Sequence, residues 1–387
     1  MAQPNYFTCT LGQAAALGLQ QPHKTVNAFI DAQADALPDA SAIAFPAPCG
    51  TDAKGGWSYT GFTFSQVQTR TTAVAKSLLN DHRDIMSNRA TIGLLCPSTP
   101  DLLFTWLALM KLGHAVLLIA PQCQPAAIRA LCNQCGAPLL LYHEQYTDLA
   151  RSTVAFNEAP PLSVKQLSVD AVKGTTSSAA VDELPVHEVS ERDVAYLHHT
   201  SGTSSGMPKP ISQPHHAAVG VLPSFPYGRE AASFTTTPLY HGGIADLFRA
   251  WSSGAQIWLF PGKGVPITAR NIVKCLDVAA AASAKDASVA NVKYFSSVPY
   301  VLQMLEADDA GLKYLQKMDI TSVGGAALPA EIGDRLVEGG VNLISRFGSA
   351  ECGFLLNSHR VYEGDSEWQY LRGSSEDRYI RFEPRDE

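Results

Sequence analysis

Residues 196–211 read Tyr196-Leu-His-His-Thr-Ser-Gly-Thr-Ser-Ser-Gly-Met-Pro-Lys-Pro-Ile211. Five of the eight residues from Thr200 to Met207 carry hydroxyl groups, and two glycines lie among them. The apolar run that begins at Val194 predicts a short buried strand, so this loop leaves a strand end. Glycine lets the backbone approach a ligand closely, successive N–H groups form an anion-binding concavity, and Lys209 adds a positive charge. The stretch therefore predicts a loop that holds a polyphosphate.

A flexible Ser/Gly linker is the alternative interpretation of such a run. It fits less well, because a linker does not need Pro208-Lys209-Pro210 directly after a buried strand. The spacing also argues against the phosphate loop of kinases and GTPases, in which the lysine directly follows a glycine. Here two residues separate Gly206 from the lysine.

Size and composition narrow the class of protein. The chain has 387 residues, of which 46% are hydrophobic and 17% charged, enough for one large core or several subdomains. A formal net charge of −7 indicates neither a nucleic acid nor an anionic membrane surface as a partner. We find no apolar stretch of about 18 residues that predicts a transmembrane helix, and no secretory signal at the start. Eight scattered cysteines suit a reducing compartment, so we expect a cytoplasmic protein.

Cys132-Asn-Gln-Cys135 is a lone C-x-x-C pair in a segment with a helical pattern. A redox pair or half of a zinc site would also have this spacing. Because no second pair completes a zinc site, two ordinary buried thiols are the favoured interpretation.

Strand-like and helix-like patterns alternate twice along the chain, which predicts an α/β protein with mostly parallel sheets covered by helices. In the first half, Ser65-x-x-Gln68 reads as a capping box that opens a helix. We predict one αβ subdomain at residues 1–190, and a second at 191–345 that carries the phosphate loop. The aromatic and charged residues that follow Arg360 predict a small β subdomain within 346–387.

Three further stretches follow predicted strands and carry chemistry-bearing residues. In the first, His241-Gly242-Gly243 opens a helix, and ligands of such sheets lie at strand carboxyl ends. A packed core histidine is the usual alternative for His241, and the flanking glycines argue for a pocket. In the second, Gly324-Gly325 alone would fit an ordinary turn. In the third, Glu351 follows a glycine after a strand, and its carboxylate suits a hard cation such as Mg²⁺.

The loop Thr200-Ser-Gly-Thr-Ser-Ser-Gly-Met-Pro-Lys209 closely resembles the phosphate-loop signature of the adenylate-forming enzymes. These include acyl-CoA synthetases, luciferases and nonribosomal-peptide adenylation domains. The flanking residues look most like fungal nonribosomal-peptide-synthetase-like proteins, especially the adenylation domains of adenylate-forming reductases. The resemblance covers nearly all of the chain, but only the large N-terminal core of the family. It implies two stacked αβ subdomains plus a small β subdomain, with the family's mobile C-terminal domain absent.

The resemblance also implies an activity: a carboxylic acid attacks ATP to give acyl-AMP and pyrophosphate. The catalytic residues it implies are Lys209, Glu351 and His241, with Glu351 holding Mg²⁺. The implied nucleotide-binding residues are Thr200, Ser201, Gly202, Thr203, Ser204, Gly206, Lys209, Gly324, Gly325, Ala326, Phe347, Gly348, Ser349 and Ala350. The implied acid pocket consists of His241, Gly242, Gly243, Ala245, Phe248 and Gly324.

Family members that activate α-amino acids usually carry Asp at the position of His241, to pair with the substrate ammonium. The histidine therefore favours an acid without an α-amino group. The full-length protein is expected to pass the acyl group to the phosphopantetheine of a carrier-protein domain, and reduction by further domains is a possible continuation. The missing C-terminal adenylation subdomain is a further expected partner.

Two departures from the family pattern leave alternatives open. Ala350 stands where the family usually has Thr or Ser, which removes a hydrogen bond to the nucleotide α-phosphate unless Ser349 or a water replaces it. No Tyr-x-Thr-Gly-Asp motif follows, and Asp365 and Asp377 lie in poor contexts to replace its Asp. The alternatives are the core of an acyl-CoA synthetase and a non-catalytic remnant that binds a nucleotide or a carboxylate.

Overall fold

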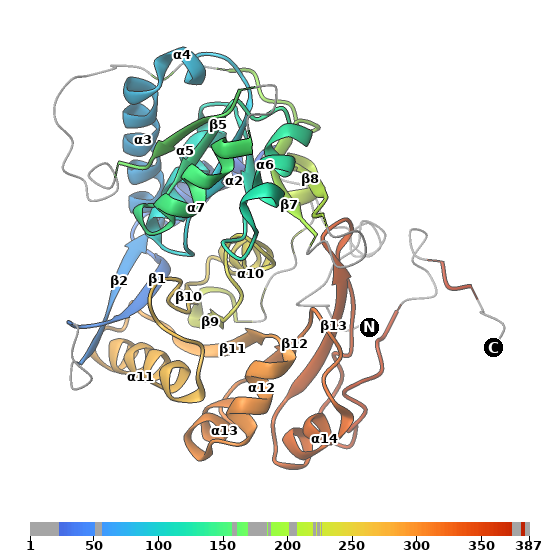
Figure 1. Cartoon of the computed structure of the whole chain (residues 1–387). Helices are drawn as coiled ribbons and strands as arrows, with labels where there is room; N and C mark the ends of the chain where they lie inside the picture. Colours follow the sequence, from blue (N-terminus) through green and yellow to red (C-terminus); the bar gives the residue numbers. More distant parts are fainter. Residues whose placement is uncertain are drawn as a thin grey trace.

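A computed structural model of the chain describes residues 23–50, 56–156, 161–168, 184, 187–200, 207–219, 222, 225, 227–373 and 381–383. Its strands form two sheets, one in the upper half of Figure 1 and one in the lower half. The alternating pattern of the sequence is thereby confirmed as an α/β fold with two mostly parallel sheets.

The smaller sheet has six strands in the order β6-β5-β3-β4-β7-β8. All neighbours pair in parallel except the hairpin of β7 and β8. The strands are β3 (Thr91–Leu95), β4 (Ala115–Leu118), β5 (Leu139–Tyr142), β6 (Ser163–Gln166), β7 (Val194–His199) and β8 (Pro210–Pro214).

The larger sheet has eight strands in the order β14-β13-β12-β11-β9-β10-β1-β2. Its two edge pairs, β1 with β2 and β13 with β14, are antiparallel, and the strands between them run parallel. The strands are β1 (Ser41–Pro48), β2 (Trp57–Thr63), β9 (Ala231–Thr235), β10 (Ile257–Leu259), β11 (Asn291–Ser297), β12 (Ile320–Val323), β13 (Leu343–Ser349) and β14 (Gly353–Asn357).

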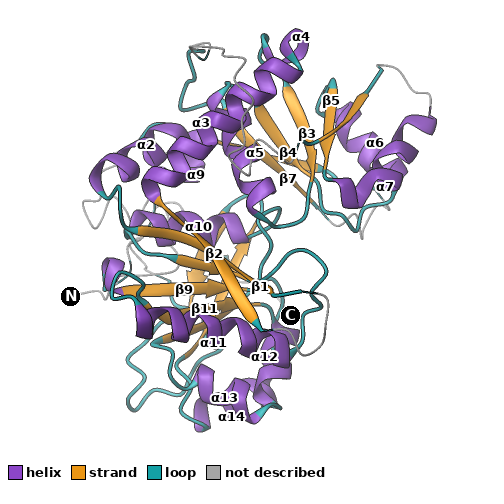
Figure 2. Cartoon of the chain, turned by 90° about the vertical axis from the view of Figure 1, so that its left-hand side faces the viewer, coloured by secondary structure: helices purple, strands orange, loops and turns teal. Residues whose placement is uncertain are grey.

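Helices cover the sheets and fill the space between them (Figure 2). The α-helices are α2 (Val26–Ala36), α3 (Phe64–Asp81), α4 (Arg83–Met86), α5 (Pro100–Lys111), α6 (Pro125–Gln134), α7 (Thr147–Ser152), α9 (His215–Val219), α10 (Gly243–Ser252), α11 (Ala269–Lys285), α12 (Pro299–Glu306), α13 (Asp309–Leu315) and α14 (Ala330–Glu338). Three short 3₁₀ helices are η1 (Glu144–Tyr146), η2 (Thr153–Phe156) and η3 (Gly228–Glu230).

The central apolar core lies between the two sheets. Helix α5 is buried from Leu102 to Met110, as its continuous apolar text requires. It meets α10 through Trp106 and Phe248, whose ring centroids are 5.7 Å apart. The indole of Trp251 ties α10 to β1 by donating to the carbonyl of Ala42 at 3.0 Å. These contacts hold helix α10 between the two sheets. The packing of the core therefore sets the position of the first residues of this helix.

The strand pairing crosses the predicted boundary between residues 190 and 191, and the division into two subdomains at that point stays a prediction. Strands β1 and β2 lie within 1–190, but they extend the larger sheet because β1 pairs in parallel with β10. Strands β7 and β8 lie within 191–345, but they extend the smaller sheet because β7 pairs with β4. Contacts between residues far apart in the chain decide which strands become neighbours. No local sequence pattern indicates that β1 and β2 join the larger sheet or that β7 and β8 join the smaller one.

The predicted capping box is wrong by two residues. Helix α3 begins at Phe64, the Thr63 hydroxyl accepts from the N–H of Gln66 at 3.3 Å, and the Gln66 side chain accepts from the N–H of Thr63 at 3.0 Å. The side chain of Gln68 instead donates to Asp31 on α2 at 2.9 Å.

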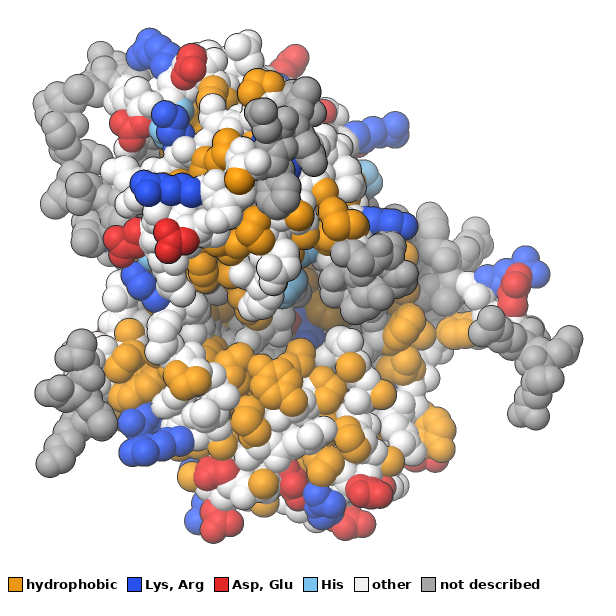
Figure 3. All heavy atoms as spheres, in the orientation of Figure 1, with side chains coloured by type: hydrophobic (Ala, Val, Ile, Leu, Met, Phe, Trp, Pro, Cys, Tyr) orange, Lys and Arg blue, Asp and Glu red, His pale blue; other side chains and the backbone are white. Residues whose placement is uncertain are grey.

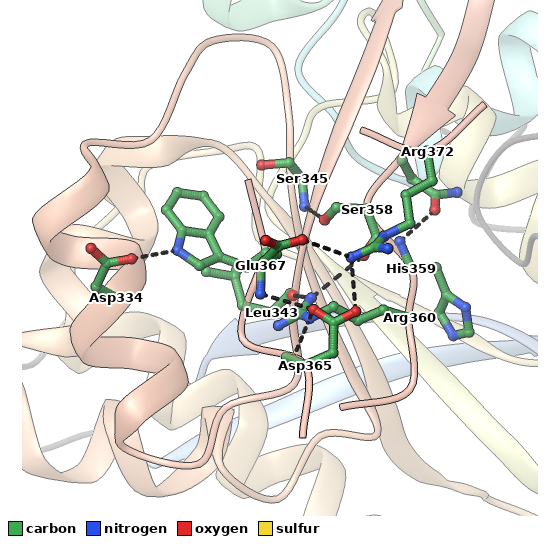
Figure 4. Close-up of polar contacts among 11 residues, drawn as sticks. Asp334, Leu343, Ser345, Ser358, His359, Arg360, Asp365, Glu367 and Arg372 are labelled. Atoms are coloured by element: carbon green, nitrogen blue, oxygen red, sulfur yellow. Dashed lines mark hydrogen bonds and ion pairs between the residues drawn. The ribbon is translucent and has the colours of Figure 1, made fainter. Parts of the chain in front are cut away.

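The predicted small β subdomain continues the larger sheet in the described residues. Beyond β14, one bridge pairs Asn357 with Arg372. Residues Ser358, Arg360 and Trp368 of the following segment then contact β13 and α14 (Figure 4). Arg360 donates to the carbonyl of Leu343 at 2.7 Å, and the Trp368 indole donates to Asp334 on α14 at 2.8 Å.

Asp365 lies in the same segment, and protein groups bind its carboxylate. Arg372 approaches this carboxylate to 2.9 Å, and the backbone N–H of Glu367 donates to it at 3.0 Å (Figure 4). It is thus occupied by the protein's own groups, consistent with its poor sequence context for gripping a ribose. Asp377 lies outside the described residues.

The C-x-x-C pair consists of free thiols, of which Cys132 is buried and Cys135 half-buried. Burial raises the pKa of Cys132 to about 12 and that of Cys135 to about 11. Such thiols are protonated at neutral pH and react slowly, which favours the packing interpretation.

Within the described part of the chain, we find no helix long and apolar enough to span a membrane.

Candidate functional site

The hairpin of β7 and β8 holds the two ends of the predicted phosphate loop together. The N–H of Thr200 donates to the carbonyl of Lys209 at 3.0 Å, and the N–H of Lys209 donates to the Thr200 hydroxyl at 3.0 Å. Residues 201–206 lie outside the described residues; the predicted phosphate-binding residues among them are Ser201, Gly202, Thr203, Ser204 and Gly206. Their role stays a prediction, and the described hairpin fixes only where their loop begins and ends.

Two histidines at the end of β7, which sequence reasoning did not single out, fix this loop start from two sides. His199 Nε2 accepts from the N–H of Ala120 at 3.0 Å, so its proton lies on Nδ1, where the carbonyl of Thr200 accepts it at 2.9 Å. His198 Nδ1 donates to the carbonyl of Tyr240 at 3.3 Å. The signal in the sequence was two polar residues at the end of an apolar strand.

Burial keeps both imidazoles neutral at physiological pH. It lowers the pKa of His198 to about 4, and it also lowers the pKa of His199. Neutral rings can both donate and accept, which is what these contacts require.

The loop between β9 and α10 brings His241 to the same place. The residue is exposed as a whole, and the ring centroids of His199 and His241 lie 6.2 Å apart. The protein atoms packed around His241 still lower its pKa by desolvation, with a smaller contribution from His199. The end of β7 in the smaller sheet therefore adjoins the start of α10, which follows a strand of the larger sheet (Figure 1).

The two glycines at the start of α10 have different roles. A Cβ on Gly243 would lie 2.3 Å from the carbonyl oxygen of Thr237 and 2.6 Å from that of Pro238, whereas a Cβ on Gly242 would meet its nearest atom at 3.7 Å. Only Gly243 is required by close backbone approach; Gly242 is exposed and leaves space beside the helix start.

We predict that Gly243→Ala lowers the free energy of unfolding by about 1–3 kcal/mol, because rigid backbone atoms occupy the new methyl position. Gly242→Ala is the matched control, and it should change stability by less than about 0.5 kcal/mol. Urea denaturation of both variants measures the difference. Equal stabilities would show that the tight turn before α10 is not required.

The remaining predicted acid-pocket residues differ in exposure. Ala245 is half-buried on α10. Phe248 is 1% exposed and lies in the core, where it contacts Phe29 and Trp106 edge-on or tilted. Phe248 therefore has a packing role that the sequence had not indicated, and its predicted contact with the acid stays a prediction.

The turn after β12 carries the predicted adenine-side residues. Gly324 is buried, and its N–H donates to the carbonyl of Ser297 at the end of β11, at 3.2 Å. Gly325 adopts a φ of +84°, a conformation that favours glycine. Gly325 and Ala326 are both exposed, so the backbone of this turn is open to solvent.

Strand β13 delivers the predicted metal-binding turn. Phe347 is 53% exposed, and the residues that follow it, Gly348, Ser349, Ala350 and Glu351, are exposed as well. A Cβ on Gly348 would lie 2.3 Å from the carbonyl oxygen of Gly353, so the tight crossing to β14 requires glycine there.

Two contacts hold the turn around Glu351. The Ser349 hydroxyl accepts from the N–H of Cys352 at 3.2 Å, and it keeps its own proton for another acceptor. The side chain of Gln213 on β8 donates to the carbonyl of Ala350. The hairpin that begins the predicted phosphate loop is thereby joined directly to the turn that carries Glu351.

The loops at the carboxyl ends of the parallel strands in both sheets face one another. The N–H of Leu239, after β9, donates to the hydroxyl of Ser98, after β3, at 3.0 Å. Gly262, after β10, lies against the backbone of Ser98, where a Cβ would come within 2.5 Å. The surface is hollowed where the two halves meet, and hydrophobic side chains line both rims (Figure 3).

The described side chains of the candidate site suit a nucleotide–magnesium complex better than a protein-only metal site. No group of three or more His, Cys, Asp or Glu side chains in the described chain could hold a metal ion. Glu351 supplies one exposed carboxylate. Magnesium typically takes one or two carboxylates and completes its shell with phosphate oxygens and water, so the donor set fits an ion that arrives with a nucleotide.

A protein-family model described as "AMP-binding enzyme" matches residues 30–373. Among curated proteins, the non-ribosomal peptide synthetase ascB of Acremonium egyptiacum is 28% identical over 314 residues, covering 78% of this chain and 27% of its own length. The adenylate-forming reductase stbB of Stachybotrys bisbyi is 26% identical over 302 residues, covering 74% of this chain and 26% of its own length. The chain thus spans about a quarter of the length of these relatives.

Solved structures share the fold. The N-terminal subdomain of Klebsiella oxytoca NpsA in complex with 3-hydroxyanthranilyl-AMSN has a TM-score of 0.65 at 17% identity, covering 88% of this chain and 77% of that one. The adenylation domain of a keto acid-selecting module, bound to a keto acyl adenylate, has a TM-score of 0.67 at 14% identity, covering 89% of this chain and 61% of that one.

Proposed function

Because the chain belongs to the AMP-binding enzyme family, we propose that it activates a carboxylic acid with ATP as an acyl-adenylate. The carboxylate oxygen attacks the α-phosphorus, the bond to the bridging oxygen breaks, and pyrophosphate leaves with the electron pair. Enzymes accelerate such transfers mainly by positioning the reactants and by stabilising charge.

One observation carries the proposal. The start of the predicted phosphate loop, the start of α10, the turn after β12 and the turn after β13 lie at one junction of the two sheets. In open α/β sheets, ligands bind outside the carboxyl ends of the strands. A polyphosphate and an acid bound at this junction would lie side by side.

We assign the nucleotide to the β7–β8 loop and to the turns after β12 and β13. Thr200 and Lys209, together with the loop between them, would bind the β- and γ-phosphates. Gly324, Gly325 and Phe347 would border the adenine. Glu351 would hold the Mg²⁺, which when bound supplies positive charge against the phosphate oxygens.

We assign the acid to the start of α10, and we infer that it lacks an α-amino group. An α-ammonium needs an anionic partner, and His241 offers an imidazole whose pKa is lowered. The next carboxylate on the same helix, Asp246, is 3% exposed and bonded to Arg249 and Arg346. It is thus engaged within the protein.

For the longer protein of which this chain would be part, we propose transfer of the acyl group to the phosphopantetheine thiol of a carrier-protein domain. The similarity to fungal synthetase-like and reductase proteins supports this step. A C-terminal adenylation subdomain would be the intramolecular partner.

ATP–pyrophosphate exchange over a panel of aryl, keto, aliphatic and α-amino acids tests the proposal on the full natural protein. Exchange with an acid that lacks an α-amino group is expected. Exchange only with α-amino acids would contradict the acid assignment. Transfer of the γ-phosphate without exchange would indicate a kinase, and nucleotide binding without exchange for any acid would indicate a non-catalytic remnant.

We predict that Ala350→Thr raises kcat/KM for ATP in this exchange by about 10-fold or more, since a hydrogen bond to a charged group contributes about 1.5–3 kcal/mol. Ala350 is exposed, and Gln213 contacts only its backbone carbonyl, so the new hydroxyl leaves the turn intact. Ala287→Thr, in an exposed turn after α11, is the control. An unchanged rate in Ala350→Thr would mean that Ser349 or water already makes this bond.

A further inference from the structure

A buried ionic cluster joins α10, β9 and β13 beneath the proposed site. The carboxylate of Asp246 accepts from the Thr235 hydroxyl at 2.7 Å, from Arg346 Nη1 at 3.0 Å and from Arg249. The three charged residues are 2–7% exposed. Burial alone would raise the pKa of Asp246, but Arg346, Arg249 and the Thr235 hydroxyl outweigh it and lower the pKa, so the carboxylate stays ionised.

Such a cluster contributes little to stability for its size. Removing charges from water costs several kcal/mol per ion, and well-packed apolar side chains of similar volume are often as stabilising. An ion pair instead fixes the relative orientation of the elements that carry it, because a guanidinium group and a carboxylate bond in only a narrow range of relative positions. The elements that the cluster joins therefore indicate its role.

Asp246 and two of its partners, Arg346 and Thr235, lie on or next to elements of the proposed site. Asp246 lies in the first turn of α10, the helix that His241 and its glycines open. Arg346 directly precedes Phe347 and the turn that carries Glu351. Thr235 ends β9, and its hydroxyl also accepts from the N–H of Thr237 at 3.1 Å, at the beginning of the loop to His241.

Two further contacts extend the cluster toward the proposed adenine side. A Cβ on Gly324 would lie 3.2 Å from the carbonyl oxygen of Arg346 and 3.8 Å from its Nε. The ring of Phe354, on β14, stacks on both guanidinium groups, with centroid distances of 4.5 Å to Arg346 and 5.0 Å to Arg249. The cluster thus adjoins the turn after β12 and strand β14.

We propose that Asp246 and Arg346 form a positioning pair that fixes the acid pocket at the start of α10 relative to the nucleotide-binding turn of β13. The inference rests on the proposed function. The pair holds the two half-sites at the separation that lets the acid meet the α-phosphorus. It acts on the joined substrates, and each substrate alone needs only its own half-site.

Arg346→Met is the decisive variant, because it leaves Asp246 bonded to Arg249 and Thr235 and so leaves a balanced ion pair in the core. Thr235→Val is the second variant, which keeps all three charges and removes one hydroxyl. Arg335→Met, which breaks an exposed pair with Glu306 between α14 and α12, is the matched control.

The test uses the full natural protein and the acid that gives the fastest exchange in the panel. We expect Arg346→Met to lower the kcat of exchange on the order of 10²-fold while the KM values for ATP and for the acid change by less than about threefold. Affinity for the corresponding acyl-sulfamoyl adenosine should fall on the order of 10²-fold, and affinity for AMP should be retained within about threefold. Thr235→Val should show the same pattern at about 10-fold, and Arg346→Lys should restore part of the kcat.

A merely structural role would lower the melting temperature and the active fraction, with AMP and the acyl-adenylate analogue affected equally. That result, or kinetics of Arg346→Met equal to those of Arg335→Met, would overturn the positioning role while leaving the proposed function standing. Absence of exchange and of nucleotide binding in the unmodified protein would overturn the proposed function and this inference with it.

Discussion

Replacing Lys209 by alanine is expected to lower kcat/KM for ATP in pyrophosphate exchange on the order of 10²-fold. The lysine is exposed at the end of the proposed phosphate loop, and a positive charge beside phosphate oxygens forms charge-assisted hydrogen bonds about twice as strong as neutral ones. The hairpin uses only the backbone of Lys209, through its N–H and its carbonyl. The substitution therefore removes the charge and keeps the loop ends in place.

Lys285→Ala, at the exposed end of α11, is the matched control and should leave exchange unchanged. Lys209→Arg keeps the charge on a longer, planar group, and it should recover part of the rate. If exchange by Lys209→Ala equals that of the unmodified protein, Lys209 does not bind the phosphates.

Glu351→Gln is expected to lower the same rate by about 10²–10³-fold and to raise the Mg²⁺ concentration needed for half-maximal exchange. An amide of the same shape preserves the turn, which is held by Ser349 and Gln213 rather than by the Glu351 side chain. The amide lacks the negative charge that a hard cation prefers. Titration of exchange with Mg²⁺ at saturating ATP measures both effects.

Glu338→Gln, an exposed acid at the end of α14, is the control for loss of one negative charge. A Glu351→Gln variant with a lower rate but an unshifted Mg²⁺ dependence would assign Glu351 to the turn's geometry. An unaltered rate would remove it from the site.

Much of the fold could be predicted from local sequence patterns. Helix α10 begins at Gly243, where the sequence predicts that His241-Gly242-Gly243 opens a helix, and strand β12 ends at Val323, directly before the glycine pair that was predicted to follow a strand. The apolar periodicity and the flanking glycines that mark them are short-range properties. The capping box was displaced by two residues because Thr63 and Ser65 both offer an N-cap hydroxyl within one turn, and only the packing of Phe64 in the core selects between them.

The candidate site was predicted in part for the same reason. Motifs placed His241, Gly325 and Glu351 after strand ends, and the structure describes each there. His198 and His199 were missed because their partners, Tyr240 and Ala120, lie far along the chain. No short segment of the sequence contains both residues of such a contact.

By itself, the sequence determined the α/β class, the succession of helices and strands, and the strand from which the predicted phosphate loop leaves, because these depend on apolar periodicity and glycines. Only the tertiary structure decided that β1 and β2 leave the first half for the larger sheet, and that Asp246 meets Arg346 one hundred residues away. The physical reason is that strand neighbours and buried ion pairs are selected by the packing of the whole chain, in which each buried polar group must find its partner.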